Sequence, residues 1–352
     1  MGKNDYKTVS FDEKNLAVVI VDQTLLPREK KYVALDDIES VREAICSLRV
    51  RGAPAIGVAA AFGLFAHMKR SPGENYADRR EIFERAKSRL STARPTAVNL
   101  DWALGSMAAV FESNINGGLE TLLGALYEAA MEIQSDDVDS CRRIGEYGSA
   151  LINGGSGVLT HCNAGALATS MYGTALAPMY LAHERGVAFR AYADETRPLL
   201  QGARLTAYEL TEAGIDVTLI CDNMVASVMD RGWVDAVFVG CDRVASNGDA
   251  ANKIGTCGVA IVAASYGIPF YVCAPYSTID TKTATGSDIK IEERDPYEVT
   301  GLWYDRQIAP AGVKVYNPAF DVTPARYITA FITERGIVRP PYNFLHESQN
   351  LG

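Results

Sequence analysis

The stretch Gly154-Gly155-Ser156-Gly157-Val158-Leu159-Thr160-His161-Cys162-Asn163-Ala164-Gly165 decides which fold the sequence predicts. Its apolar middle is typical of a short buried strand, and the glycines before it give a flexible entry. Polar residues follow where this strand ends. A second apolar run, at 234–239, leads in the same way into Gly240-Cys241-Asp242-Arg243. Ligands of open parallel sheets bind at the carboxyl ends of the strands, so we expect Cys162 and Asp242 to face one crevice.

The residues from this stretch onward alternate between strand-like and helix-like runs. Strands are predicted at 158–160, 189–192, 217–220, 236–239, 270–272 and 313–315. Helices are predicted between and after them, at 172–184, 203–212, 224–230, 254–265 and 323–334. Strands that alternate with helices predict a parallel, doubly wound sheet.

The residues before this stretch are mostly helical in pattern. Ile38, Val41, Ile45 and Leu48 recur on one face of a helix, and further helices are predicted at 55–67, 76–90, 99–111 and 119–151, after a short strand at 16–21. A chain of 352 residues is also long for one hydrophobic core. We therefore expect an α/β protein. A mostly helical N-terminal domain, 1–140, precedes a Rossmann-like parallel-sheet domain, 141–352, with the boundary inside helical sequence.

Charge and composition exclude several classes of protein. The net charge of −9, without a long basic run, disfavours nucleic acid and anionic membranes as partners. The polar N-terminus carries no apolar signal sequence, and no apolar stretch reaches the roughly eighteen residues that span a membrane. Seven scattered cysteines without a C-x-x-C pair fit a reducing cytoplasm and give no zinc-ligand spacing. We expect a cytoplasmic protein that binds a small molecule and holds no metal.

Two residues at the strand ends are candidates for catalysis. Cys162 can act as a nucleophile or general base if its thiolate is stabilised; the alternative is a buried, inert thiol. Asp242 can act as a general acid or base; the alternative is a salt bridge to Arg243 or a turn cap. Of the neighbours of Cys162, His161 is expected to orient or pack, and Asn163 to hold a substrate hydroxyl.

Phosphate recognition is indicated twice in the N-terminal half. Arg51-Gly52-Ala53-Pro54 and Arg94-Pro95-Thr96 each place an arginine directly before a predicted helix start. Free N–H groups and the helix dipole favour an anion there, although either arginine alone could serve a surface ion pair. Asn252 and Lys253 add an amide and a cation. The chain has no G-x-G-x-x-G turn and no Walker A motif, so a dinucleotide or ATP site is not supported.

Together these motifs resemble the methylthioribose-1-phosphate isomerases. That family shares its fold with the regulatory subunits of translation initiation factor 2B and with ribose-1,5-bisphosphate isomerases. The resemblance runs from about residue 22 to about residue 318. It rests on segments 51–57, 94–100, 160–165, 193–204, 242–243, 247–249, 252–256 and 291–294.

The resemblance implies a role for each matching residue. It assigns catalysis to Cys162 and Asp242, and substrate binding to Arg51, Gly52, Ala53, Arg94, Gln201, Asn252 and Lys253, with Gln201 assigned by resemblance alone. It implies a homodimer and neither a metal nor an organic cofactor. Two positions depart from the family pattern, Cys241 before the catalytic aspartate and Tyr276 in a variable segment.

The implied reaction is the conversion of S-methyl-5-thioribose 1-phosphate to S-methyl-5-thioribulose 1-phosphate, an aldose–ketose isomerisation in methionine salvage. One alternative is an isomerase of a related sugar, 5-deoxyribose 1-phosphate or ribose 1,5-bisphosphate, which requires a different pocket for the C5 substituent. Another is a non-catalytic regulatory subunit of the same fold. The presence of both Cys162 and Asp242 argues against that second alternative.

Overall fold

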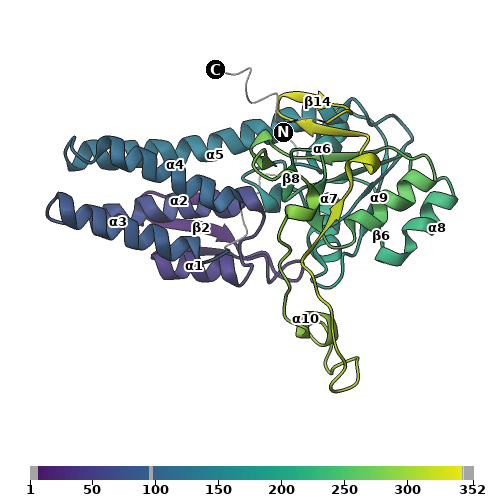
Figure 1. Cartoon of the computed structure of the whole chain (residues 1–352), viewed down its shortest axis with the longest axis horizontal. Coiled ribbons are helices and arrows are strands. Elements are labelled where there is room, and N and C mark those ends of the chain that lie inside the picture. Colours follow the sequence, from purple (N-terminus) through teal and green to yellow (C-terminus); the bar gives the residue numbers. More distant parts are fainter. Residues whose placement is uncertain (1–6, 95–97, 343, 345–352) are drawn as a thin grey trace. The chain divides into compact units, whose positions relative to one another are not determined.

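The computed structural model describes residues 7–94, 98–342 and 344 (Figure 1). Packing divides the chain into two units, each with its own hydrophobic core. The helical unit comprises the described residues up to Arg142 together with Ala164–Gly173. The sheet unit comprises Arg143–Asn163 and the described residues from Thr174 onward.

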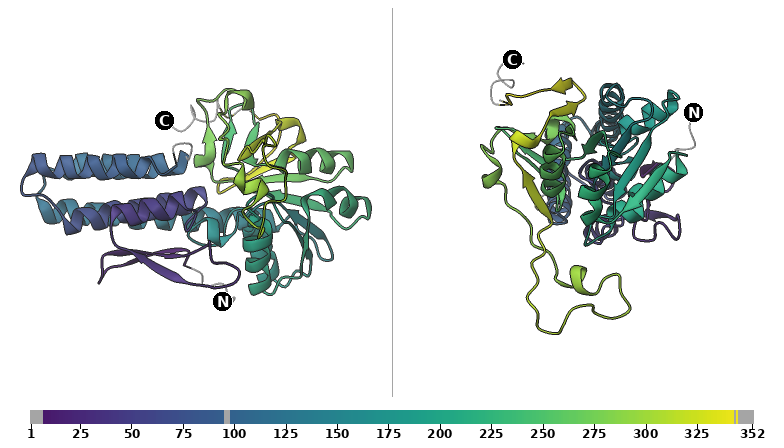
Figure 2. Two further views of the ribbon diagram at one scale, coloured as in Figure 1. Left: turned by 90° about the horizontal axis from the view of Figure 1, so that it is seen from below. Right: turned by 90° about the vertical axis from the view of Figure 1, so that its right-hand side faces the viewer.

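The helical unit is organised around helix α2 (Ala53–Arg70), which is apolar on nearly all sides and therefore buried. Helices α1 (Ile38–Cys46), α3 (Tyr76–Ser91) and α4 (Val98–Asn114) pack against it. An antiparallel sheet of β1 (Val9–Asp12), β2 (Ala17–Val21) and β3 (Tyr32–Leu35) also contacts α2 (Figure 2). The last helix, α5 (Leu119–Ser149), forms one continuous helix of 31 residues.

The sheet unit contains a seven-stranded sheet in the order β14-β13-β10-β7-β4-β5-β6. Its strands are β4 (Gly157–Thr160), β5 (Arg190–Asp194), β6 (Val217–Ile220), β7 (Ala236–Val239), β10 (Phe270–Cys273), β13 (Ala330–Thr333) and β14 (Gly336–Val338). All pairs are parallel except β13 with β14. The parallel strands follow the order 3-2-1-4-5-6, which reverses direction between β4 and β7.

Four helices connect these strands: α6 (Ala177–Glu184), α7 (Ala207–Glu212), α8 (Val225–Asp230) and α9 (Thr256–Ser265). Apolar side chains of α8 and α9 share a core with β7 and β10. The predicted fold class, a mostly helical N-terminal region followed by a parallel α/β sheet, is confirmed. None of the helices in the described part of the chain is both long and apolar enough to cross a membrane.

A second, four-stranded sheet was not predicted. It has the order β11-β8-β9-β12, built from β8 (Arg243–Ala245), β9 (Ala250–Lys253), β11 (Ile279–Asp280) and β12 (Phe320–Thr323). Between β11 and β12 the chain makes a long excursion that carries the short helix α10 (Tyr297–Thr300) (Figure 1). These strands have two to four residues, too few to give a clear alternation in the sequence.

Three predictions for the sheet domain were wrong. The helix at 323–334 is replaced by strands, because a continuous apolar run such as that of β13 does not distinguish a buried strand from a helix. The strand at 313–315 is absent, and Val313 is 51% exposed, so no neighbour buries it. The helix expected from residue 172 begins only at α6, because Tyr172 and Gly173 adopt positive φ angles.

Candidate active site

The predicted catalytic residues follow two adjacent strands of the parallel sheet. Strands β4 and β7 pair through Val158 with Ala236 and Leu159 with Val237. Cys162 comes two residues after β4 ends, and Asp242 comes three residues after β7 ends. Because the strands are parallel and in register, both residues follow the same edge of the sheet, at the point where the strand order reverses.

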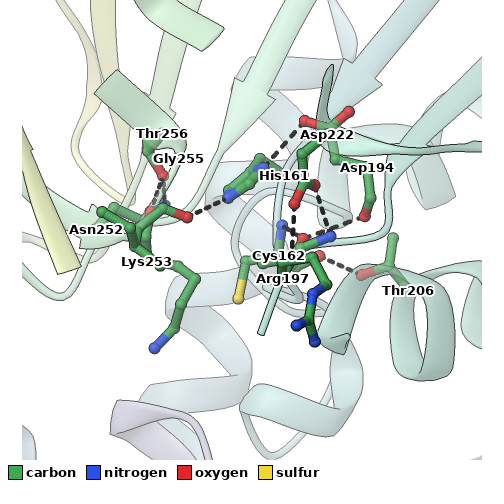
Figure 3. Close-up of polar contacts among 12 residues, drawn as sticks. His161, Cys162, Asp194, Arg197, Thr206, Asp222, Asn252, Lys253, Gly255 and Thr256 are labelled. Carbon is green, nitrogen blue, oxygen red and sulfur yellow. Dashed lines mark hydrogen bonds and ion pairs between the residues drawn. The ribbon is translucent and has the colours of Figure 1, made fainter. Parts of the chain in front are cut away.

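The main chain of Cys162 is held on both sides in an uncommon conformation. Its φ angle is +66°, which costs a residue with a Cβ about 1–2 kcal/mol. Its amide donates to Thr196 Oγ1 (2.8 Å), and its carbonyl accepts from Thr206 Oγ1 (2.6 Å). The side chain is 9% exposed. Figure 3 shows the thiol pointing to the same side of the strand ends as the Lys253 ammonium and the Arg197 guanidinium.

A β-hairpin brings Asp242 and Asn252 together. Strands β8 and β9 pair Arg243 with Ala251, and the Asp242 amide donates to the Ala251 carbonyl (2.9 Å). Asp242 therefore lies beside Ala251, the residue that directly precedes Asn252. Arg243 forms an ion pair with Asp280 (3.3 Å).

Lys253 and Gln201 offer polar groups to a ligand in different ways. The Lys253 ammonium lies 4.5 Å from the centre of the Phe320 ring, a favourable cation–π distance. Gln201 is 5% exposed, and its Oε1 has no hydrogen-bond partner within the described residues. A buried acceptor without a donor costs about 1–3 kcal/mol, which a ligand hydroxyl would offset. Gln201 also directly precedes a π-helical turn, Gly202–Thr206, a feature frequent at functional sites.

In the helical unit, Arg51 and the start of α2 form a group suited to an anion. Arg51 is 9% exposed and donates from Nε to Gln23 Oε1 (3.1 Å). Gly52 has a φ of +95° and is the N-cap of α2, and no side chain caps this helix end. An uncapped N-terminus of an 18-residue helix favours an anion through its N–H groups and dipole. Ala53 is the first residue of α2, so the predicted phosphate-binding segment forms this helix start.

Arg94 is half-buried and directly precedes residues 95–97. The helix start expected at Pro95-Thr96 lies outside the described residues, and α4 is described from Val98.

The main chain runs directly from Cys162 into a loop of the helical unit, Ala164–Gly173. Thr8 Oγ1 donates to the Ala166 carbonyl (2.6 Å), Gln23 Nε2 donates to the Leu167 carbonyl (2.7 Å), and the Asp137 carboxylate accepts from the Ser170 amide. A Cβ on Gly52 would overlap the main chain of Ala168, so this loop also packs on the start of α2. No pattern in the sequence predicted this loop.

Two carboxylates near Cys162 were not singled out from the sequence. Asp194 ends β5, and Asp222 follows β6, so each stands at the same sheet edge as Cys162. His161 Nδ1 lies 3.0 Å from Asp194 Oδ2, and both side chains are at most 1% exposed. Asp222 accepts from the main-chain amides of Thr196 and Arg197 (2.7 Å each). The strand-end rule applied to Cys162 would have found both carboxylates if it had been applied to every strand.

One group of side chains in the described part of the chain is close enough together to hold a metal ion: His161, Asp194 and Asp222. Their potential ligand atoms lie within 4.8 Å of one another. Both ring nitrogens of His161 and both oxygens of Asp222 already take part in hydrogen bonds. The group is therefore built as a hydrogen-bonded scaffold. Asn163 is likewise engaged within the protein, because its amide nitrogen donates to Thr206 and to Glu209.

The two residues that depart from the family pattern each make a close contact within the protein. The Cys241 sulfur lies 3.1 Å from the Arg243 carbonyl oxygen, and burial, followed by the charge of Asp242, raises the pKa of this thiol. Cys241 therefore stays neutral beside Asp242. Tyr276 is stacked under the Arg335 guanidinium, 3.7 Å from the ring centre.

The model of the initiation factor 2 subunit family matches residues 49–340, most of the chain. The chain belongs to this family. It is 61% identical to the methylthioribose-1-phosphate isomerase of Symbiobacterium thermophilum over 334 residues, which cover 95% of this chain and 93% of the relative. It is 56% identical to the 5-deoxyribose 1-phosphate isomerase of Petrotoga mobilis over 334 residues, which cover 95% and 96%.

A solved structure agrees with these relatives. The crystal structure of 5-methylthioribose 1-phosphate isomerase from Pyrococcus horikoshii superimposes with a TM-score of 0.92 at 43% identity. The match covers 99% of this chain and 96% of that one. These comparisons confirm the resemblance inferred from the sequence motifs.

Proposed function

We propose that the chain is an aldose–ketose isomerase that converts S-methyl-5-thioribose 1-phosphate into S-methyl-5-thioribulose 1-phosphate in methionine salvage. The observation that carries the proposal is the thiol of Cys162 and the carboxylate of Asp242 at the ends of adjacent parallel strands. The names of the relatives support an isomerase of a sugar 1-phosphate. Their names differ in the group at C5 of the sugar, so the methylthio substrate is the finer part of the proposal.

The chemistry requires a proton donor before any hydrogen moves between carbons. Phosphate on the anomeric oxygen holds the sugar as a furanose, so the ring has to open first. In the proposed reaction, Asp242 in its protonated form donates to the ring oxygen as the bond from that oxygen to C1 breaks. Positioned general acids of this kind contribute about 10²–10⁴-fold in rate.

Two routes complete the conversion. In the first, the hydrogen on C2 moves as a hydride to the electron-poor C1. The C2 hydroxyl gives its proton to the Asp242 carboxylate, which restores the protonated acid, and the ketone forms. In the second, the Cys162 thiolate removes the C2 proton, and the resulting thiol exchanges its hydrogen with solvent before a proton returns from it to C1. The C2 hydroxyl gives its proton to the Asp242 carboxylate, and the ketone forms. A site shielded from water favours the hydride route, because an enediolate would lack solvation there.

Substrate binding is assigned to the remaining candidates. Arg51, the start of α2 at Gly52 and Ala53, and Arg94 are proposed to bind the phosphate. Gln201, Asn252 and Lys253 are proposed to bind the sugar hydroxyls. The unpartnered Oε1 of Gln201 supports its assignment as an acceptor.

The test is an assay of the purified protein with methylthioribose 1-phosphate, 5-deoxyribose 1-phosphate and ribose 1,5-bisphosphate, beside Cys162→Ser and Asp242→Asn. We expect the methylthio sugar to give the highest kcat/KM and each substitution to lower kcat by about 10²–10⁴-fold. Preferred turnover of 5-deoxyribose 1-phosphate, the substrate in the name of one relative, would move the assignment to that sugar. No turnover of any sugar by folded protein would favour the regulatory-subunit alternative.

The two routes are separated by isotope exchange. Substrate carrying deuterium at C2 is expected to keep that deuterium at C1 of the product if the hydride route operates. Appearance of the C2 deuterium in solvent during turnover would refute the hydride route and leave proton removal by Cys162.

A further inference from the structure

The residue before Cys162 links two segments of the candidate site. His161 Nε2 lies 2.9 Å from the main-chain oxygen of Ile254, which follows Asn252 and Lys253. A carbonyl oxygen only accepts hydrogen bonds, so Nε2 must carry a hydrogen. The other ring nitrogen, Nδ1, faces the carboxylate of Asp194 at 3.0 Å.

We propose that His161 is a positioning residue that donates hydrogen bonds from both ring nitrogens and thereby fixes Cys162 relative to the segment carrying Asn252 and Lys253. Asp194 is the second positioning residue, because its carboxylate accepts the hydrogen bond from Nδ1. The inference rests on the proposed function of Cys162 and Lys253. Neither His161 nor Asp194 is proposed to touch the substrate.

The charges around His161 favour an imidazole that is protonated on both nitrogens. Burial by itself lowers the pKa of His161, but Asp194 and then Asp222 outweigh it and leave that pKa raised. Asp321 also lies close enough to interact with His161, and Glu195 with Asp194. These titratable neighbours are all acidic. Burial raises the pKa of Asp194 to about 6, so the pair has a strong tendency to retain its shared proton.

The segment on the Ile254 side is held in place by close packing and by a second carboxylate. A Cβ on Gly255 would lie 2.8 Å from His161 Cε1, so only glycine permits the ring to sit there. Asp321 accepts from the amides of Gly255 (2.8 Å) and Cys257 (3.1 Å). The segment after Lys253 is therefore held by His161 at a carbonyl and by Asp321 at two amides.

The segment on the Cys162 side is held through Asp194. The Asp194 carbonyl accepts from Thr196 Oγ1 (3.1 Å), and the same hydroxyl oxygen accepts from the Cys162 amide (2.8 Å). Asp194 thus connects to Cys162 by two paths, its side chain through His161 and its main chain through Thr196. Loss of the Nδ1 bond is expected to disturb Cys162, and loss of the Nε2 bond is expected to disturb Lys253.

Two substitutions separate these bonds. His161→Asn places an amide nitrogen near the position of Nδ1 and loses the Ile254 bond. His161→Gln places an amide nitrogen near the position of Nε2 and loses the Asp194 bond. We expect His161→Asn mainly to raise KM, by about tenfold, and His161→Gln mainly to lower kcat, by about tenfold. His183→Asn and His183→Gln, at an exposed histidine of α6, serve as matched controls and are expected to leave both constants unchanged.

A measurement on the wild-type protein tests the proton positions independently of activity. In ¹⁵N-histidine NMR at pH 7.5, we expect hydrogens on both ring nitrogens of His161. Its signals are assigned by elimination, by substituting each of the other three histidines of the chain in turn, and exposed His183 serves as the reference. An unprotonated nitrogen at Nδ1 would overturn the inference even if the variants failed to fold. Active variants with the kcat and KM of wild type would also overturn it. If wild type turns over no sugar, the proposed function fails, while the NMR result still decides the hydrogen-bonding arrangement.

Discussion

Substitution of Gly52 by alanine tests whether the start of α2 is built around a residue without a side chain. Gly52 has a φ of +95°, and an added Cβ would lie 2.6 Å from the carbonyl carbon of Ala168. The nearest atoms all belong to main chain, so no flexible side chain can move aside. The loop or the helix start has to shift instead.

The expected magnitude combines two penalties. A residue with a Cβ held in a glycine-only region of φ and ψ costs about 1–3 kcal/mol. Forcing an extra carbon into a packed contact costs about 1–3 kcal/mol more. We therefore expect Gly52→Ala to lower the free energy of unfolding by about 2–6 kcal/mol, a large part of the roughly 5–15 kcal/mol typical of folded proteins. Displacement of the Ala53 amide should also raise KM for a phosphorylated substrate.

The assay is urea and thermal unfolding followed by circular dichroism, with Gly105→Ala as the matched control. Gly105 lies within α4, is exposed, and an added Cβ would meet no atom within 4 Å. Alanine there is expected to stabilise by about 0.5–1 kcal/mol, because glycine inside a helix costs that much. If Gly52→Ala proved as stable as wild type, the proposed packing of Ala168 on Gly52 would be refuted.

Two further substitutions probe buried polar groups. Gln201→Leu removes a buried acceptor that has no partner in the described residues, so we expect the free energy of unfolding to rise by about 1 kcal/mol. The same substitution removes a proposed contact to the substrate, so we expect KM to rise about tenfold. A lower melting temperature with an unchanged KM would contradict both expectations. Burial raises the pKa of Asp137 to about 6, above its unfolded value of 3.8, so the folded protein favours the protonated carboxyl. The contribution of this group to folding stability is therefore fully present below pH 3.8 and is lost as the pH rises through 6. Asp137→Asn should therefore match wild type at pH 4 and exceed it by about 1–2 kcal/mol at pH 7.5 in urea unfolding, a modest gain because Asp137 is partly exposed and screened by solvent.

The sequence predicted the parts of the fold whose pattern is local. The strands that became β4 and β7 could be recognised because their apolar runs end in polar and glycine residues. Since neighbouring parallel strands end at one edge, Cys162 and Asp242 could be placed together before the structure was known. The helix predicted at 323–334 failed for the opposite reason, because the apolar run of β13 carries no period that distinguishes strand from helix.

Other parts of the candidate site depend on the strand order, which the sequence does not contain. The contact between His161 and Asp194 requires β4 and β5 to be neighbours, and the Ile254 bond requires β9 to end beside β4. The buried Gln201 oxygen without a partner in the described residues could not be predicted either, because burial and hydrogen bonding of one side chain depend on the folded surroundings. Gln201 entered the prediction through family resemblance alone.

The loop after β4 differs from the glycine-rich turn found at this position in dinucleotide-binding sheets with the strand order 3-2-1-4-5-6. In dinucleotide-binding sheets of this order, the turn after the first strand opens a helix whose N-terminus holds the pyrophosphate. Here β4 ends in His161 and Cys162, and the following loop packs within the helical unit before α6 begins at Ala177. In the helical unit, α2 begins behind Arg51 and Gly52 without a side-chain cap. The first strand of the sheet thus ends in a thiol where dinucleotide-binding sheets have a phosphate-binding turn, and for this reason the proposed phosphate site is assigned to residues of the helical unit.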